Sequence, residues 1–234
     1  MKLFVRVFVC LAVIAFSLNA LAAEKANITT AKDGIRISTC PVKSVAQDAK
    51  TPAVESAPES LAALYNNLAF DYRKAIYWCC YGGLLAGPNS TYGLEHGTAV
   101  WQATGFTPGT NTTVTSVKLG VAYQSGTFTD VIVTINADNG GIPGAVLSTF
   151  TVKKMPVFGS CCEVKTSSVK GGVAVTAGTP YWIVIGMEPT SDFQGSWNFD
   201  ISDQVDAIPN AYLYDGVWYP FDANVNFSFG VYGQ

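Results

Sequence analysis

The feature of this sequence that most limits its fold is a series of short β-prone runs separated by turn residues. The runs are rich in Val, Ile, Thr and aromatic residues, several alternate polar with apolar positions, and Gly, Pro, Asn or Asp separate many of them. They lie at Ala99–Phe106, Val114–Tyr123, Val131–Ala137, Ala145–Val152, Gly171–Thr176, Tyr181–Met187, Trp197–Asp200, Tyr212–Tyr214, Trp218–Phe221 and Asn226–Tyr232. Many short strands with few helical stretches are typical of two packed sheets, so we expect an all-β fold, an antiparallel β-sandwich resembling a jelly roll.

Two turn signals within this series predict hairpins. Asp215-Gly216 separates two aromatic runs and predicts a tight hairpin turn. The segment Asn136–Gly141 has some likeness to a calcium loop, but Gly140 and Leu147 fall at positions of that loop that need oxygen-bearing side chains. We therefore interpret this segment as a second hairpin turn.

The first residues of the chain have the pattern of an export signal. Lys2 and Arg6 form a positive start, Val7–Phe16 is apolar, and Ala20-Leu21-Ala22 offers small residues for cleavage. We expect a signal peptide over 1–22 and a protein that is secreted, to the extracellular space or the periplasm. No later stretch is long and apolar enough to cross a bilayer, so we expect no membrane span in the mature protein.

Residues 23–60 separate the expected signal peptide from the β-prone series. They hold Pro41, Pro52 and Pro58 and show no sustained apolar period, which predicts a linker or flexible arm. A short strand is compatible with Ile35–Ser38, and a single helical turn with Ser60–Tyr65. We expect the β-sandwich domain to occupy residues 61–234.

Charge is sparse throughout the chain. Fourteen Lys and Arg stand against 17 Asp and Glu, the net charge is −3, and 13% of residues are charged. Nucleic-acid binding needs a dense basic surface, and an anionic membrane attracts clustered Lys and Arg. The composition therefore argues against both kinds of partner.

Two cysteine doublets, Cys79-Cys80 and Cys161-Cys162, follow the export signal. Exported thiols are usually oxidised, so we expect these four in disulfides. Neighbouring residues of a regular strand point to opposite faces, so each doublet fits a turn or a strand end better. Of the three pairings, two link the doublets and the third makes two vicinal bridges that strain the peptide. We favour inter-doublet pairing because an unstrained disulfide separates its Cα atoms by about 5.5–6 Å.

A zinc site is the alternative use of four thiolates. Structural zinc sites take spaced ligands, and adjacent cysteines chelate poorly, so we expect no metal and no cofactor. Cys40 is left over by this count. A capped thiol, an intermolecular bond and a free thiol all remain open for it.

No residue pattern indicates catalysis. His96 is the sole histidine, no Gly-x-Ser-x-Gly element accompanies it, and a surface loop is its expected place. A glycosidase needs two carboxylates at a set distance, but nothing in the sequence selects a pair. The candidate carboxylates are Asp192, Asp200, Asp203, Asp206, Asp215 and Asp222. We therefore assign no catalytic residue and expect a protein that is not an enzyme.

Aromatic residues of the last third are the candidates for ligand binding. Exposed rings stack on sugar faces, and Trp218, Tyr219, Trp197 and Tyr214 are the residues considered for this role. Trp197 and Phe199 alternate with polar neighbours, which favours a place in the core for Trp197. Trp218 follows a tight turn and is the better candidate for exposure.

Several elements, in order, resemble the choice-of-anchor R domain of bacterial exported proteins. They are Tyr65-Asn66-Asn67-Leu68, the A-x-G-F-T-P element of Ala103–Pro108, the V-x-V-x-I-x-x-D-N-G-G-I-P-G element of Val131–Gly144, the A-G-T-x-Y-W-x-V element that includes Gly178–Val184, and the F-x-F-G-V-Y-G element of Phe227–Gly233. The resemblance covers roughly Leu64–Gln234, and the two doublets are similar to those of a subset of the family. It implies a secreted or surface β-sandwich module and supplies no catalytic residues.

These observations favour a non-enzymatic exported module that interacts with the cell surface or the extracellular matrix, with a polysaccharide as a candidate ligand. A hydrolase of extracellular polysaccharides is one alternative. A purely structural envelope component, with Cys40 as an intermolecular link, is another. The oligomeric state is not specified by any pattern in the sequence.

The cysteine pattern makes a direct prediction. Peptide mapping of the exported protein without reduction should recover peptides that join the Cys79-Cys80 segment to the Cys161-Cys162 segment, because only such bonds avoid vicinal strain. A reduced and alkylated sample serves as the control. Recovery of Cys79–Cys80 and Cys161–Cys162 bridges alone would contradict the pairing.

Overall fold

The structure, a computed structural model, describes residues 27–30, 36–39, 61–68, 77–157, 165–200, 208–221 and 226–234. For residues 27, 29, 36, 38, 39 and 77–80 it describes the backbone alone. The expected signal peptide over 1–22 lies outside these residues, as do Cys40, Cys161 and Cys162.

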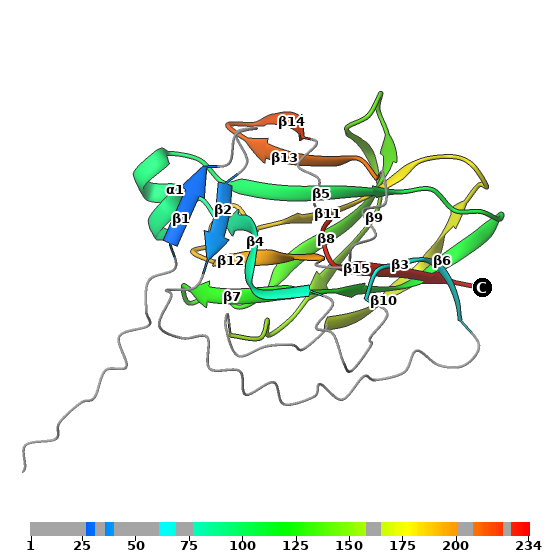
Figure 1. Cartoon of the computed structure of the whole chain (residues 1–234), viewed down its shortest axis with the longest axis horizontal. Coiled ribbons are helices and arrows are strands. Elements are labelled where there is room, and N and C mark those ends of the chain that lie inside the picture. Colours follow the sequence, from blue (N-terminus) through cyan, green and yellow to red (C-terminus); the bar gives the residue numbers. More distant parts are fainter. Residues whose placement is uncertain are drawn as a thin grey trace, which may run out of the picture.

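The described strands form two antiparallel sheets (Figure 1). The main run of the 11-stranded sheet follows the order β14-β13-β5-β11-β8-β9. Its strands are Val217–Phe221 (β14), Asn210–Tyr214 (β13), Val100–Phe106 (β5), Tyr181–Gly186 (β11), Val131–Asp138 (β8) and Pro143–Val152 (β9). Strand β11 reads Tyr-Trp-Ile-Val-Ile-Gly and is buried along its whole length, which suits β-branched and aromatic residues at the middle of a sheet.

A second run of the same sheet joins the first through the pairing of Ala86 with Val100. It follows the order β1-β2-β4-β12-β7, with strands Asn27–Thr30 (β1), Arg36–Thr39 (β2), Tyr77–Ala86 (β4), Gln194–Asp200 (β12) and Val121–Ser125 (β7). Strands β1 and β2 come from the segment expected to be an arm. Because β2 pairs with β4 and Ile37 is buried in the core, this part of the segment belongs to the sheet.

The smaller sheet follows the order β10-β6-β15-β3. Its strands are Lys165–Val175 (β10), Thr112–Leu119 (β6), Phe229–Gly233 (β15) and Ala62–Asn66 (β3). Strand β6 continues through Gly120 into β7 of the larger sheet, so one stretch of chain contributes to both sheets.

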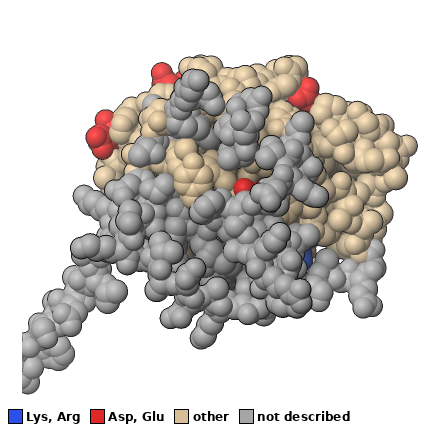
Figure 2. Space-filling view, viewed as in Figure 1, with Lys and Arg blue, Asp and Glu red and all other residues tan. Residues whose placement is uncertain are grey.

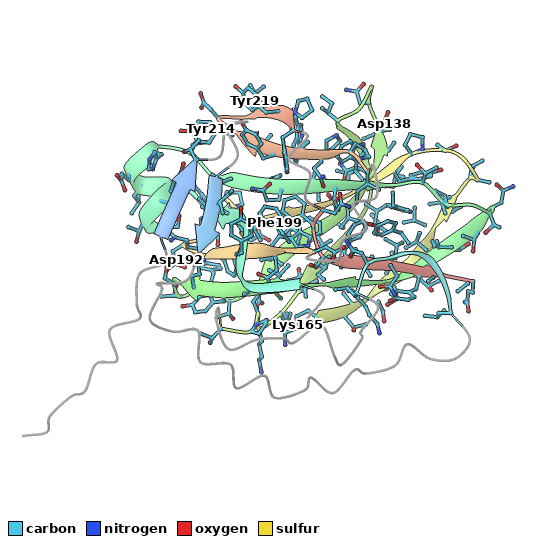
Figure 3. All side chains as sticks on the ribbon, viewed as in Figure 1. Asp138, Lys165, Asp192, Phe199, Tyr214 and Tyr219 are labelled. Carbon is cyan, nitrogen blue, oxygen red and sulfur yellow. The ribbon has the colours of Figure 1, made fainter. Side chains whose placement is uncertain are left out.

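Aromatic side chains fill the space between the sheets. Phe227 stacks on Trp197 at 4.6 Å and on Phe199 at 5.2 Å between ring centroids, and Phe229 stacks on Tyr65 at 4.5 Å. Phe199 lies in the interior of the molecule in Figure 3. The predicted antiparallel β-sandwich is thereby confirmed.

Two local elements differ from the sequence predictions. The helical turn expected at Ser60–Tyr65 is wrong, because this segment pairs as β3 with β15. A helix, α1 (Thr91–His96), follows β4; Ser90 caps its start, and Gly97 ends it with a φ of 70°. In the part of the chain that the structure describes, no helix has the length and apolarity needed to cross a membrane.

The loop after β7 is held by a carboxylate. The two oxygens of Asp192 accept hydrogen bonds from the backbone N–H groups of Thr127 at 2.7 Å and Phe128 at 2.9 Å. Desolvation raises the pKa of Asp192, but the bonds from the Phe128 and Thr127 N–H groups outweigh it and hold the pKa below its ordinary value of 3.8. A lowered folded-state pKa means that this stabilisation is present above the unfolded-state pKa and is lost as the pH falls through the folded-state pKa.

Replacing this carboxylate should therefore have a pH-dependent effect. Asp192→Ala should lower the free energy of unfolding by about 1 kcal/mol at pH 7, as for the loss of a cap. The difference from the unchanged protein should be smaller at pH 2.5, because the stabilisation is lost as the pH falls toward the lowered folded-state pKa of Asp192. Urea denaturation at both pH values measures it, with the exposed Glu95→Ala as control. An equal difference at both pH values would show that the charge has no part in the effect.

Candidate functional site

The hairpin of β13 and β14 carries three of the four aromatic residues considered for ligand binding. Its turn is Asp215-Gly216, with φ angles of 52° and 73°, the left-handed pair that a two-residue type I′ hairpin requires. The Asp215 N–H donates to Oγ1 of Thr98 at 3.0 Å, which ties the turn to the loop before β5. The predicted hairpin is confirmed, and its anchor is a tertiary contact.

Tyr219 presents an open ring on one face of this hairpin. It pairs with Tyr212 across the strands, and the two rings stack at 5.3 Å with 21° between their planes. Tyr212 is 8% exposed, whereas Tyr219 is 41% exposed and its neighbour Val217 is 50% exposed. The buried ring thus supports the exposed one from below, and Figure 3 places Tyr219 at the outer edge of the molecule.

Trp218 points to the other face of the hairpin. It is partly buried and packs with Trp101 against a cluster on β5, β11 and β13 that includes the fully buried Trp182. The indole Nε1 of Trp182 donates to Oδ1 of Asp138 at 2.7 Å. Trp218 therefore contributes to packing, and only part of its ring faces solvent.

Tyr214 and Trp197 have different environments. Tyr214 is partly buried beside both the main core and the smaller cluster around Leu84. Trp197 is 0% exposed, and its Nε1 donates to the carbonyl of Ser228 at 3.0 Å. The structure thus brings Tyr214, Trp218 and Tyr219 together on one hairpin and places Trp197 in the core, away from any open surface.

Charged side chains are few among the described residues of the hairpin and of its neighbouring strand β5. Strands β5, β13 and β14 contain no Lys, Arg, Asp or Glu, and Asp215 lies at the turn. On the face shown in Figure 2, acidic side chains are scattered over the described surface and do not form a patch. Among the residues that the structure describes, no three His, Cys, Asp or Glu side chains are grouped to hold a metal ion.

The candidate catalytic groups that the structure describes are separated from one another or have structural contacts. His96 is exposed at the end of α1, where its ring stacks on Tyr92 at 4.0 Å. Asp200 ends β12, and Asp192 precedes the first residue of this strand, Gln194; the strand alone spans about 20 Å, well beyond the separation of a glycosidase pair. Asp215 lies at the hairpin turn, whereas Asp203, Asp206 and Asp222 are outside the described residues.

Cys79 and Cys80 lie within β4, at a break in its pairing with β12. Asn198 pairs with Gly82 and Asp200 with Tyr77, so the one intervening residue of β12, Phe199, faces the four residues 78–81 of β4. The doublet thus occupies an irregular part of a strand, where we had expected a turn or a strand end. Its side chains and the doublet Cys161-Cys162 lie outside the described residues, and inter-doublet pairing stays a prediction.

Comparison with known proteins returned no match, either among protein-family models or among curated proteins. The resemblance to the choice-of-anchor R domain therefore stays a prediction based on the motifs quoted above.

Sequence reasoning counted Tyr212 among the aromatic residues of the last third but did not identify it as the support of Tyr219, and it did not assign Val217 to this site. Both belong to the face of Tyr219. Side chains alternate between the two faces along Ala211-Tyr212-Leu213, and the two-residue turn at Asp215-Gly216 carries this alternation into β14. A period of two carried through a two-residue hairpin puts Tyr212, Val217 and Tyr219 on one face. This alternation was the sequence signal that could have identified Tyr212 as the ring that supports Tyr219.

Truncation to alanine should destabilise the protein much more at Trp197, in the core, than at Tyr219, on the surface. Trp197→Ala should lower the free energy of unfolding by about 3–5 kcal/mol, because it leaves a cavity between the sheets. Tyr219→Ala should cost under about 1 kcal/mol, since it removes an exposed ring and one stacking contact. Urea denaturation of both variants measures this, and equal losses would contradict the assignment.

Proposed function

We propose that this protein is an exported, non-enzymatic β-sandwich module that binds a polysaccharide of the cell surface or extracellular matrix through the β13–β14 hairpin. The observation that carries the proposal is the ring of Tyr219, 41% exposed and stacked on the buried Tyr212. A tyrosine held in this way offers a flat, amphipathic surface with little conformational freedom left to lose on binding.

The chemistry of the hairpin favours a sugar. Sugar rings have C–H faces of low polarity, and these faces pack on aromatic rings while the hydroxyl groups stay hydrated. By fold analogy, β-sandwich modules bind glycans in this way. Val217 lies on the same face of β14 and widens the apolar surface beside Tyr219. The proposed contact surface is therefore made of Val217 and Tyr219.

The sparse charge of the site favours a neutral ligand. Polyanionic glycans are bound by Lys and Arg, and the described cations of the domain lie on β6, on β10 and in the loop after β9, away from the hairpin strands. A neutral polysaccharide requires no such groups. Export, which the first 22 residues predict, would bring the module to this ligand.

Binding should depend on the exposed ring. Screening on an array of neutral glycans, followed by titration of a bound glycan, should give a dissociation constant that rises at least tenfold in Tyr219→Ala, equivalent to about 1.4 kcal/mol. Phe128→Ala removes another exposed ring, at a loop after β7, and should leave the constant unchanged. The glycan should show no new reducing ends after incubation.

Two results would refute this proposal. One is an array and a cell-wall pull-down that are both blank for the folded protein. The other is a glycan bound equally by the unchanged protein and by Tyr219→Ala, which would place the binding surface elsewhere.

A further inference from the structure

The turn of the β8–β9 hairpin contains Asn139-Gly140, the one Asn-Gly pair of the sequence. The Asn139 N–H donates to the carbonyl of Ile142 at 2.9 Å, and Gly140 and Gly141 have φ angles of 66° and 90°. Two central residues with positive φ are typical of a type I′ turn. The hairpin turn predicted for this segment is thus confirmed, and the Asn-Gly pair lies at its tip.

This tip is open to solvent. Asn139 and Gly140 are both exposed, and a Cβ atom on Gly140 would meet no heavy atom within 4 Å. Asp138, the residue before the pair, lies at the outer edge of the molecule in Figure 3. Water and hydroxide ions therefore reach the turn in the folded protein.

Two groups of the pair can react with each other: the side-chain amide of Asn139 and the backbone nitrogen of Gly140. Among the residues that the structure describes, neither group has a hydrogen-bond partner. The turn is held by other groups, the N–H of Asn139 and the N–H of Gly141, which donates to the Asp138 carboxylate at 3.2 Å. A reaction between the two open groups therefore starts without breaking a hydrogen bond of the turn.

Asn89 provides the contrast within the same chain. It is exposed like Asn139, but its Nδ2 donates to the carbonyl of Thr190 at 3.1 Å. The next residue, Ser90, is 1% exposed, and its N–H donates to the carbonyl of Gly87 at 3.1 Å. The amide and the following nitrogen are thus both held at Asn89, whereas both are open at Asn139.

We propose that Asn139-Gly140 is a self-modification site, where the folded protein converts Asn139 into aspartate and isoaspartate with water as the co-reactant. Asparagine is one of the thermally labile residues. A glycine that follows it leaves the attacking nitrogen unhindered, because glycine has no side chain. The open turn adds solvent access and free reacting groups to this favourable pair.

The reaction proceeds through a ring. Hydroxide removes the proton from the Gly140 nitrogen, which attacks Cγ of Asn139. The N–Cγ bond forms, the Cγ–Nδ2 bond breaks, and ammonia leaves after taking a proton from water, which restores the hydroxide. Water then opens the resulting succinimide at either carbonyl. Opening at Cγ gives aspartate, opening at the main-chain carbonyl gives isoaspartate, and no group is oxidised or reduced.

Either product would change the hairpin. Each places a carboxylate next to that of Asp138, whose Oδ1 accepts from Nε1 of Trp182 at 2.7 Å. Isoaspartate also adds a methylene group to the main chain, so the bond between Asn139 and Ile142 that closes the turn has to change its geometry. The site lies on the β8–β9 hairpin, so the inference is independent of the glycan surface proposed on β13–β14.

Mass spectrometry of the folded protein tests the site. The protein is incubated in mildly alkaline buffer and digested at acidic pH, which stops the reaction. Asn139 should deamidate at least about tenfold faster than Asn89, as for a barrier lower by about 1.4 kcal/mol. Synthetic peptides with aspartate or isoaspartate at this position identify the products. A smaller ratio of rates, or aspartate as the sole product, would overturn the proposal.

Urea below the unfolding transition shows whether the folded protein is the form that reacts. Low concentrations of urea raise the unfolded fraction steeply while nearly all molecules stay folded. The rate at Asn139 should therefore stay constant over this range. A rate that rises in proportion to the unfolded fraction would contradict a reaction of the folded turn.

A matched pair of variants tests the role of the Gly140 nitrogen. Gly140→Ala and Gly141→Ala each place a side chain at a positive φ, with no heavy atom within 4 Å of the new Cβ, so both strain the backbone of the turn. Only Gly140→Ala adds a methyl group beside the attacking nitrogen. Its rate of deamidation should be about tenfold below that of Gly141→Ala. Equal rates in the two variants would show that this nitrogen is not the attacking group.

Discussion

The packing of Phe227 between the two sheets is the contact on which the rest of the fold depends. Its ring meets Trp197 at 4.6 Å, Phe199 at 5.2 Å and Phe221 at 6.0 Å between centroids. Each such side chain contributes about 1.5–3 kcal/mol by leaving water, with a further contribution from ring geometry. In a chain with only 13% charged residues, burial of this kind is the main force that can hold the sheets together.

The same ring connects the core to the proposed binding surface. From Phe227 the contacts continue through Phe221 and Tyr212 to Tyr219, with centroid separations of 6.0, 6.1 and 5.3 Å. The exposed ring is thus the outer end of a series whose inner members are buried. A surface residue supported in this way can change without loss of the fold, while its orientation is set by the core.

Pattern and propensity predicted the strands where side chains alone decide the structure. The alternation of residues in β8 and the apolar run of β11 were sufficient to predict these two strands. Strand β4 was missed because Gly82 and Gly83 disfavour a strand by propensity. The fold needs them there: a Cβ on Gly82 would lie 2.2 Å from the carbonyl oxygen of Trp197, and one on Gly83 2.7 Å from the ring of Phe227. Likewise, pairing with β15 overrode the helical preference of the segment that forms β3.

The sequence by itself determined the sandwich class, the hairpin turn at Asp215-Gly216 and the sparse charge of the chain, because these depend on local residue preferences and composition. Only the tertiary structure decided which faces of the strands are covered. Alternation divides a strand into two faces, but contact with a second sheet selects the buried one. It placed Trp197 inside and left Tyr219 open on the support of Tyr212.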